Sequence, residues 1–370
     1  MARPHPFLLA VARGDVPQEP IDAGVVESAV EHRLAGSLHR MVSEGAADAD
    51  RHATRALAVH HLNQSHRRTL LLRAMGLLAD RLHAADVQWL TFKGLAAEHL
   101  YYEMDAERPA ADIDVLLSPD SVVRAAAAIR AIEPEHPTPD LIEEAVLRHV
   151  LQHVDLRLGP VPVDLHFDFF KIGLPTINHQ LIWDRSTQID LDGVAGVRTV
   201  CPEISLVGMV LHQNKDAFSL LGPMVEVQKA LTTSKVDWEF IRALVTAEGL
   251  AVPFWLGLDR IAAYTGIENV PAAPRLNDSR SKLWRAIWPT SSALSGAPGR
   301  ATAPNRQLLM PLTVSGRTRA TVGEVRRQAI PERRLFEVME RRSLAGTEYL
   351  RRLTLDRVRR LREARESSIR

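Results

Sequence analysis

Cysteine and long hydrophobic runs are almost absent from this sequence of 370 residues. Its only cysteine is Cys201, which excludes an intramolecular disulfide framework and any zinc site that needs several thiolates. No run of about 18 apolar residues occurs, so the sequence predicts no membrane-spanning helix. We therefore expect a protein of a reducing compartment, located in the cytoplasm and not bound to a membrane.

The signatures of several common enzyme classes are also missing. The sequence contains no Walker phosphate loop, no dinucleotide-binding glycine fingerprint, no HExxH zinc motif and no nucleophile-elbow serine. Hydrophobic residues make up 46% and charged residues 25% of the chain, the proportions of a globular protein that folds in water. At roughly 100–200 residues per domain, the length allows two or three domains.

Charge is unevenly distributed along the chain. The net charge is +1, yet residues 316–370 contain sixteen arginines against eight acidic residues, a local charge of +8 that leaves −7 for residues 1–315. Such a basic segment contacts nucleic acid, an acidic peptide or protein, or only solvent. Glutamates interleaved with the arginines favour a solvated helix face, and contact with nucleic acid or an acidic partner stays open.

Helical periodicity dominates both ends of the chain. Apolar residues recur there at three- and four-residue intervals, which is typical of helices with one buried side. We expect an N-terminal helical region over residues 1–85, a core over 86–200 and a C-terminal helical region over 201–370. Within the last region, residues 289–316 are rich in Ser, Gly, Ala and Pro and predict a flexible linker.

Strands are predicted in the middle of the chain, where apolar and polar residues alternate. The pattern predicts strands over residues 86–92 and 113–117. It also predicts a hairpin whose strands, 153–158 and 161–167, flank a Gly-Pro turn. With helices on either side, the fold class we expect is α+β.

Three aspartates on these predicted strands are candidates for metal binding. Asp112 and Asp114 share one face of a strand, about 7 Å apart along it, and Asp164 lies on the second strand of the hairpin. Mg²⁺ takes carboxylate, phosphate and water oxygens, and converging carboxylates are what a two-metal mechanism of phosphoryl transfer uses. The pattern predicts a site for two Mg²⁺ ions. On its own, an Asp-x-Asp pair is weak evidence for a metal site, because it also arises by chance or at a strand edge.

The turn after the first predicted strand is a candidate phosphate site. Gly94 lets backbone amides at a helix N-terminus approach a triphosphate, and Lys93 adds positive charge. A plain turn is the alternative interpretation.

Taken together, these segments resemble a known family. The matching stretches are Trp89-Leu90-Thr91-Phe92-Lys93-Gly94-Leu95-Ala96, Tyr101-Tyr102, Arg108, Asp112-Ile113-Asp114-Val115-Leu116-Leu117 and Val163-Asp164-Leu165-His166. They resemble the uncharacterised bacterial nucleotidyltransferase family with the signature LKG-x-A, Y, R-x-x-x-D-I-D-L-L-V and E-L-H, which belongs to the polymerase-beta-like nucleotidyltransferase superfamily. The resemblance covers most of the chain and is strongest over residues 87–117. It implies a small mixed-sheet nucleotidyltransferase core flanked by helical regions.

The resemblance also implies roles for individual residues. Asp112, Asp114 and Asp164 are the implied catalytic and metal-binding residues. The implied nucleotide-binding residues are Lys93, Gly94, Arg108, His166, His212 and Lys215. The chain departs from the family's pattern at three places: Lys93 stands where the superfamily has a glycine, Asp164 replaces a glutamate, and Asp216 replaces a second histidine.

Two of these residues have ordinary structural alternatives. Arg108 is placed to reach a phosphate or the leaving pyrophosphate, but it also suits a surface salt bridge with Glu103 or Glu107. His166 follows Asp164 by two residues and shares its strand face. It suits the orientation of a water, the acceptor or the carboxylate, or a purely structural hydrogen bond.

The function that the resemblance implies is metal-dependent nucleotidyl transfer. An NTP and two Mg²⁺ ions are the implied substrate and cofactors, and pyrophosphate is released. We expect the acceptor to be a hydroxyl or phosphate of a small molecule or a biosynthetic peptide. One alternative is an enzyme that modifies RNA or a protein, in a toxin-like role, and another is a non-catalytic nucleotide-binding scaffold.

Overall fold

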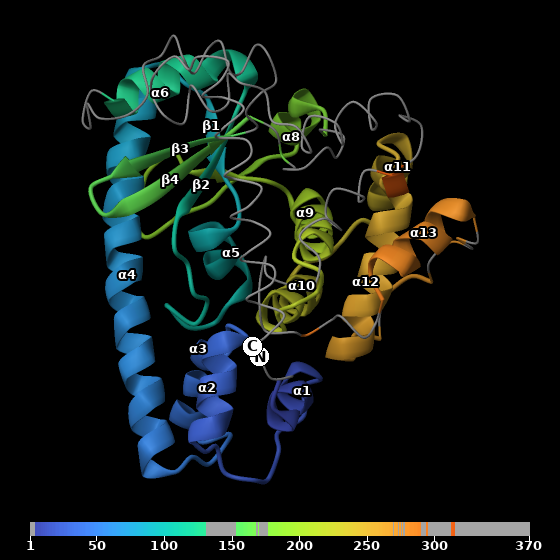
Figure 1. Ribbon diagram of the computed structural model, residues 1–370. Helices are drawn as coiled ribbons and strands as arrows, with labels where there is room; N and C mark the ends of the chain where they lie inside the picture. Colours follow the sequence, from blue (N-terminus) through green and yellow to red (C-terminus); the bar gives the residue numbers. More distant parts are fainter. Residues whose placement is uncertain are drawn as a thin grey trace, which may run out of the picture. The chain divides into compact units, whose positions relative to one another are not determined.

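The computed structural model describes most of the first 289 residues of the chain (Figure 1). The described residues are 4–130, 153–167, 169, 177–268, 270–272, 274, 276, 278–289, 294 and 312–314. Most of the predicted linker at 289–316 and the basic segment at 316–370 therefore lie outside the described residues.

The chain divides into two compact units, and each is formed from separate stretches of sequence. Unit 1 consists of Met1–Thr69, Lys93–Ala110 and Cys201–Arg317, and unit 2 consists of Leu70–Phe92, Ala111–Val200 and Thr318–Arg370. The division of the sequence at residues 85 and 200 stays a prediction.

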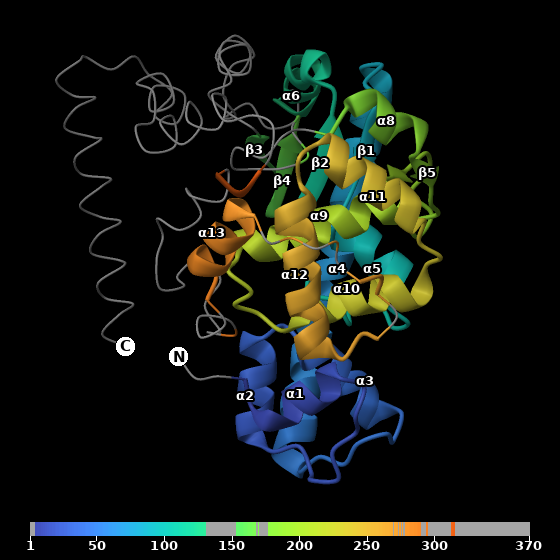
Figure 2. The same ribbon diagram turned by 90° about the vertical axis from the view of Figure 1, so that its right-hand side faces the viewer.

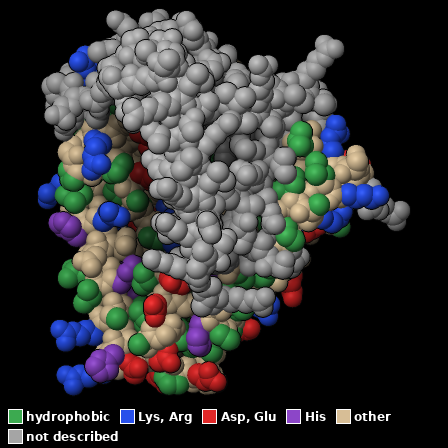
Figure 3. All heavy atoms as spheres, viewed as in Figure 1, with side chains coloured by type: hydrophobic (Ala, Val, Ile, Leu, Met, Phe, Trp, Pro, Cys, Tyr) green, Lys and Arg blue, Asp and Glu red, His purple; other side chains and the backbone are tan. Residues whose placement is uncertain are grey.

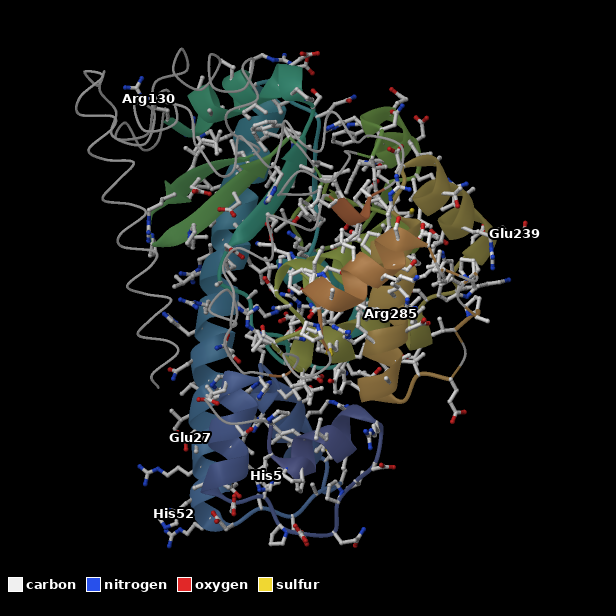
Figure 4. All side chains as sticks on the ribbon, turned by 45° about the vertical axis from the view of Figure 1, so that its right-hand side comes forward. His5, Glu27, His52, Arg130, Glu239 and Arg285 are labelled. Carbon is white, nitrogen blue, oxygen red and sulfur yellow. The ribbon has the colours of Figure 1, made fainter. Side chains whose placement is uncertain are left out.

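Four helices form the N-terminal part of the chain: α1 (Pro6–Ala12), α2 (Ala23–Glu31), α3 (Ala35–Ser43) and α4 (Arg51–Ala84). The side chain of His5, labelled in Figure 4, caps α1 by accepting a hydrogen bond from the amide of Phe7. At 34 residues, α4 is about 51 Å long. Basic, histidine and hydrophobic side chains are interspersed along the edge where α4 lies (Figure 3).

The end of α4 explains why the first strand is shorter than the sequence predicted. Asp86 has a φ of 51°, and the amide of Val87 donates to the carbonyl of Leu82. These are the features of a Schellman motif, so Asp86 and Val87 close the helix. The strand β1 accordingly covers only Trp89–Thr91, not residues 86–92.

Unit 2 contains a mixed six-stranded sheet with strand order β3-β4-β2-β1-β6-β5. Its strands are β1, β2 (Ile113–Leu117), β3 (His153–Leu158), β4 (Val161–His166), β5 (Thr187–Gln188) and β6 (Arg198–Thr199). β2 is antiparallel to β1 and parallel to β4, and β4 is antiparallel to β3. With helices before and after this sheet (Figure 1), the predicted α+β class is confirmed.

The two faces of the central strands differ in polarity. Buried aliphatic side chains occupy one face: Ile113, Val115, Leu117, Val154, Leu156, Leu158, Val161, Val163 and Leu165. The opposite face carries Asp114, Asp164 and His166. The strict alternation in the sequence sets this division, since successive side chains of a strand point to opposite faces. η1 (Pro119–Ser121), α6 (Val122–Arg130) and α8 (His179–Asp184) complete the described helices of unit 2.

Apart from an isolated β-bridge between Ile21 and Ala49, the regular secondary structure of the described residues of unit 1 is helical. Besides α1 to α3 and the first half of α4, it contains α5 (Gly94–Tyr101), α9 (Pro202–Lys215), α10 (Gly222–Thr233), α11 (Trp238–Ala247), α12 (Ala251–Thr265) and α13 (Ser279–Ile287). α9, α10 and α12 pack against one another (Figure 2). Trp255, Phe218, Trp284 and Trp288 are buried in this unit. Among the described residues, no helix is long and apolar enough to cross a membrane.

Candidate functional site

Asp114 and Asp164 are neighbours on the polar face of the sheet. They are register partners on the parallel strands β2 and β4, which places both carboxylates on the same face. On the other side of β4, Asp155 on β3 is also a register partner of Asp164. Three carboxylates therefore form a row across three adjacent strands. Asp114 is buried, Asp164 is half-buried and Asp155 is exposed.

His166 lies beside this row, two residues beyond Asp164 on β4. Its imidazole is fully buried, and Nε2 lies 2.8 Å from Oδ1 of Asp114. The ring also meets the edge of Phe92, with ring centroids 5.1 Å apart. The structure therefore places His166 against a carboxylate, one of the roles that the sequence left open.

Asp114, Asp164 and His166 together have the donors of a divalent metal site. Each offers one ligand atom, and these atoms all lie within 4.8 Å of one another. Two carboxylate oxygens and one imidazole nitrogen are common ligands of divalent cations. Asp112, half-buried just before β2, is not one of these three residues, and its predicted metal role stays a prediction.

Lys93 and Gly94 form the start of α5 in unit 1. Lys93 is the N-cap residue, and its φ of 62° and ψ of −153° are a backbone conformation that favours glycine. Its side chain makes no capping hydrogen bond, and the first turn of α5 contains no acidic residue. The N-terminus of α5 carries the positive end of the helix dipole, which favours anions, and the phosphate role of Lys93 and Gly94 stays a prediction.

His212 and Lys215 lie in the last turn of α9, also in unit 1. Nε2 of His212 is 3.2 Å from Oδ2 of Asp216, the residue that replaces the family's second histidine. Burial lowers the pKa of His212, the bond to Asp216 opposes this shift, and the charges of Lys93 and Lys215 lower the pKa further. The charge of Lys93 therefore acts on the imidazole of His212.

Arg108 is held by a carboxylate that the sequence did not suggest. Its Nε and Nη2 donate to the two carboxylate oxygens of Glu226 on α10, at 2.5 and 3.3 Å. The hydroxyl of Tyr102 donates to the same carboxylate at 3.4 Å. Both members of the ion pair are largely buried. Arg108 therefore has a structural role in unit 1, and its predicted contact with a nucleotide stays a prediction.

A second buried ion cluster fixes the same segment, and sequence reasoning missed it. The carboxylate of Glu107 is fully buried and pairs with Arg40 at 3.3 Å and Lys229 at 3.1 Å. Ser37 donates to it at 2.7 Å. These partners come from α3 and α10, more than 60 residues away in either direction. No local pattern signals such pairs.

Cys201 is a poor candidate for a nucleophile. It is buried, and burial raises the pKa of its thiol to about 11, so the reactive thiolate is scarce at neutral pH.

Of the comparisons with known proteins, one found a match. A family model described as an uncharacterised nucleotidyltransferase matches residues 23–266. No curated protein and no solved structure matches the chain. The matched residues span about two thirds of the chain and include every candidate site residue. The chain therefore belongs to this uncharacterised nucleotidyltransferase family, and nucleotidyl transfer is the activity of its class.

Proposed function

We propose that this protein transfers a nucleoside monophosphate from an NTP to a hydroxyl or phosphate of a small molecule or biosynthetic peptide. A bond forms between the acceptor oxygen and the α-phosphorus, while the bond from that phosphorus to the β-phosphate oxygen breaks and pyrophosphate leaves. The observation that supports this proposal is the convergence of Asp114, Asp164 and His166 in a chain of a nucleotidyltransferase family.

The carboxylates have separate tasks in this proposal. Asp112 and Asp114 hold the divalent ions that accompany the nucleotide, and Asp164 holds the ion nearest the acceptor. Two bound Mg²⁺ ions would neutralise phosphate charge and lower the pKa of the acceptor hydroxyl. The acceptor's proton is then lost to solvent. Asp114 and Asp164 suit these tasks because neighbouring strands fix both of their backbones and because carboxylate oxygens are ligands of hard cations.

In this proposal the phosphates of the nucleotide are bound by the residues that the family resemblance implies. The first amides of α5 and the ammonium group of Lys93 bind the triphosphate, with Gly94 allowing a close approach of the backbone. Lys215 adds a second positive charge at the end of α9. His212 acts there as a neutral hydrogen-bonding group, since burial and the neighbouring lysines lower its pKa.

The test separates nucleotide binding from chemistry. Calorimetric titration with each NTP and Mg²⁺ is paired with pyrophosphate release in the presence of cell extract as a source of acceptor. We expect Asp112→Ala and Asp114→Asn to lose nucleotide binding. Asp164→Asn is expected to bind NTP but release no pyrophosphate.

The matched control is Asp80→Asn, which removes an exposed carboxylate of α4 in the same unit as the metal-binding candidates. It is expected to behave as the wild type. The baseline is a triple variant in which Asp112, Asp114 and Asp164 are all replaced. If the wild type binds no NTP and releases no more pyrophosphate than this triple variant, the catalytic proposal fails. NTP binding without pyrophosphate release from any acceptor source would instead support a non-catalytic scaffold.

A further inference from the structure

His166 has a different environment from the one that its implied nucleotide-binding role requires. A nucleotide-binding side chain must present its polar atoms to a ligand that enters from solvent. The side chain of His166 is instead fully buried, and its Nε2 already lies against Asp114. The imidazole is therefore placed to act on the metal-binding carboxylates rather than on a base or sugar.

The spacing of the three side chains matches a single coordination shell. With bonds of about 2.1–2.2 Å, neighbouring ligand atoms of a six-coordinate ion are about 3 Å apart and opposite ones about 4.3 Å. The 2.8 Å between Nε2 of His166 and Oδ1 of Asp114 is close to the first value. All three candidate ligand atoms lie within 4.8 Å of one another, so they are gathered at one place on the sheet.

The imidazole is also held in place before any ion binds. It projects from β4, which pairs with β2 on one side and β3 on the other. Phe92 packs its ring against the imidazole at 5.1 Å, and Phe169 packs against Phe92 at 5.2 Å. A ligand fixed by strand pairing and aromatic packing loses little rotamer entropy when it coordinates a metal.

We propose that Asp114, Asp164 and His166 form one mixed carboxylate–imidazole centre, in which Nε2 of His166 is a direct ligand and which prefers Mn²⁺ to Mg²⁺. Mg²⁺ binds oxygen and keeps its waters, whereas first-row transition ions also accept imidazole nitrogen. Among those ions, Mn²⁺ suits the oxygen ligands that two carboxylates and a phosphate supply. The inference rests on the metal-dependent function proposed above, in which Mg²⁺ remains the ion expected to arrive with the triphosphate.

The experiment uses Mn²⁺ alone as the probe, with the full chain and no nucleotide. Electron paramagnetic resonance measures bound Mn²⁺, its displacement by Mg²⁺, and the coupling of the electron spin to ligand nitrogen. We expect nitrogen coupling in the wild type, and an isotope shift of that coupling when the histidines carry ¹⁵N. Half-displacement of Mn²⁺ is expected to need at least a tenfold excess of Mg²⁺.

His166→Gln replaces the nitrogen with an amide oxygen at a similar reach. It is expected to abolish the nitrogen coupling and to weaken Mn²⁺ binding at least as much as loss of an outer-shell partner does, about 10- to 100-fold, while the preference over Mg²⁺ shrinks. His99→Gln, which alters an exposed histidine of α5, is the matched control and is expected to keep all wild-type values. If His166→Gln does not fold, the ¹⁵N-histidine comparison on the wild type still decides the question.

The inference is overturned if the protein binds no Mn²⁺ or if equimolar Mg²⁺ displaces the bound Mn²⁺. It is also overturned if Mn²⁺ binds without nitrogen coupling, because His166 is then only a hydrogen-bond partner that positions Asp114. The outcome is independent of transfer: nitrogen coupling without pyrophosphate release keeps the metal centre and rejects the proposed function. Pyrophosphate release without nitrogen coupling keeps the function and rejects the centre.

Discussion

Replacing Lys93 with glycine separates the backbone role of this position from its charge. The observed φ of 62° and ψ of −153° lie in a region that residues with a Cβ atom rarely adopt and that costs them about 1–3 kcal/mol. Glycine adopts it without strain. A lysine at this position therefore stabilises the fold less than a glycine would, which is consistent with selection for its ammonium group.

The expected magnitudes follow from two opposing terms. Lys93→Gly removes about 1–3 kcal/mol of strain but makes the unfolded chain more flexible, which costs about 0.4–1 kcal/mol. The net gain in the free energy of unfolding is then roughly 1 kcal/mol. Lys93→Ala keeps the strain and removes the same charge. Losing a charge-assisted hydrogen bond of about 1.5–3 kcal/mol weakens NTP binding by roughly 10- to 150-fold in both variants.

The assay compares the two variants with each other and with the wild type. Thermal melting or urea denaturation gives stability, and calorimetric titration with NTP and Mg²⁺ gives affinity. We expect Lys93→Gly to melt a few degrees above Lys93→Ala, roughly 2–4 °C per kcal/mol, with equally weak nucleotide binding. If the glycine variant is the less stable one, the claim of backbone strain at Lys93 is wrong. If either variant binds NTP like the wild type, the claim that the ammonium group binds the nucleotide is wrong.

Two further predictions concern stability in unit 1. Arg108→Gln leaves the largely buried carboxylate of Glu226 without its cation, so we expect a loss of about 3–5 kcal/mol in the free energy of unfolding. The double variant with Glu226→Gln should recover part of that loss in urea denaturation, and an unchanged denaturation midpoint in Arg108→Gln would contradict the structural role. Burial lowers the pKa of His32 and His212, so the folded state disfavours their protonation. The contribution of these two neutral imidazoles to the free energy of unfolding should be fully present above a free histidine's pKa of about 6.5 and should fall as the pH drops below that value. A denaturation midpoint at pH 5.5 equal to that at pH 7.5 would disprove this prediction.

The strands were predictable because their sequence pattern is local. Alternation set the bounds of β2 and placed the hairpin strands within one residue of their observed ends. A two-residue turn at Gly159 and Pro160 also determines the register, which pairs Leu158 with Val161. Counting back from that pair places Asp155 opposite Asp164. The position of Asp155 beside the other two carboxylates is therefore predictable from the sequence, although the sequence analysis did not include it.

The long-range contacts were not predictable from one sequence. Arg108 and Glu226 are 118 residues apart, and only the packing of α10 in unit 1 brings them together. The composition of the units has the same cause, because Lys93–Ala110 belongs to unit 1 although the sheet strands on either side of it belong to unit 2. The backbone strain at Lys93 also escaped sequence analysis, since propensity alone predicts glycine wherever φ is positive.

Asp164 and His166, the two residues of β4 in the proposed metal centre, come from one short motif. A spacing of two residues puts both side chains on the same face, while Val163 and Leu165 between and beside them fill the buried face. A shift of one residue in the register of β4 would turn the side chains of Asp164 and His166 toward that apolar face. The carboxylate would then be buried without a partner, at a cost of several kcal/mol. The hydrophobic residues of this motif therefore protect the geometry of the site as strictly as the polar ones define its chemistry.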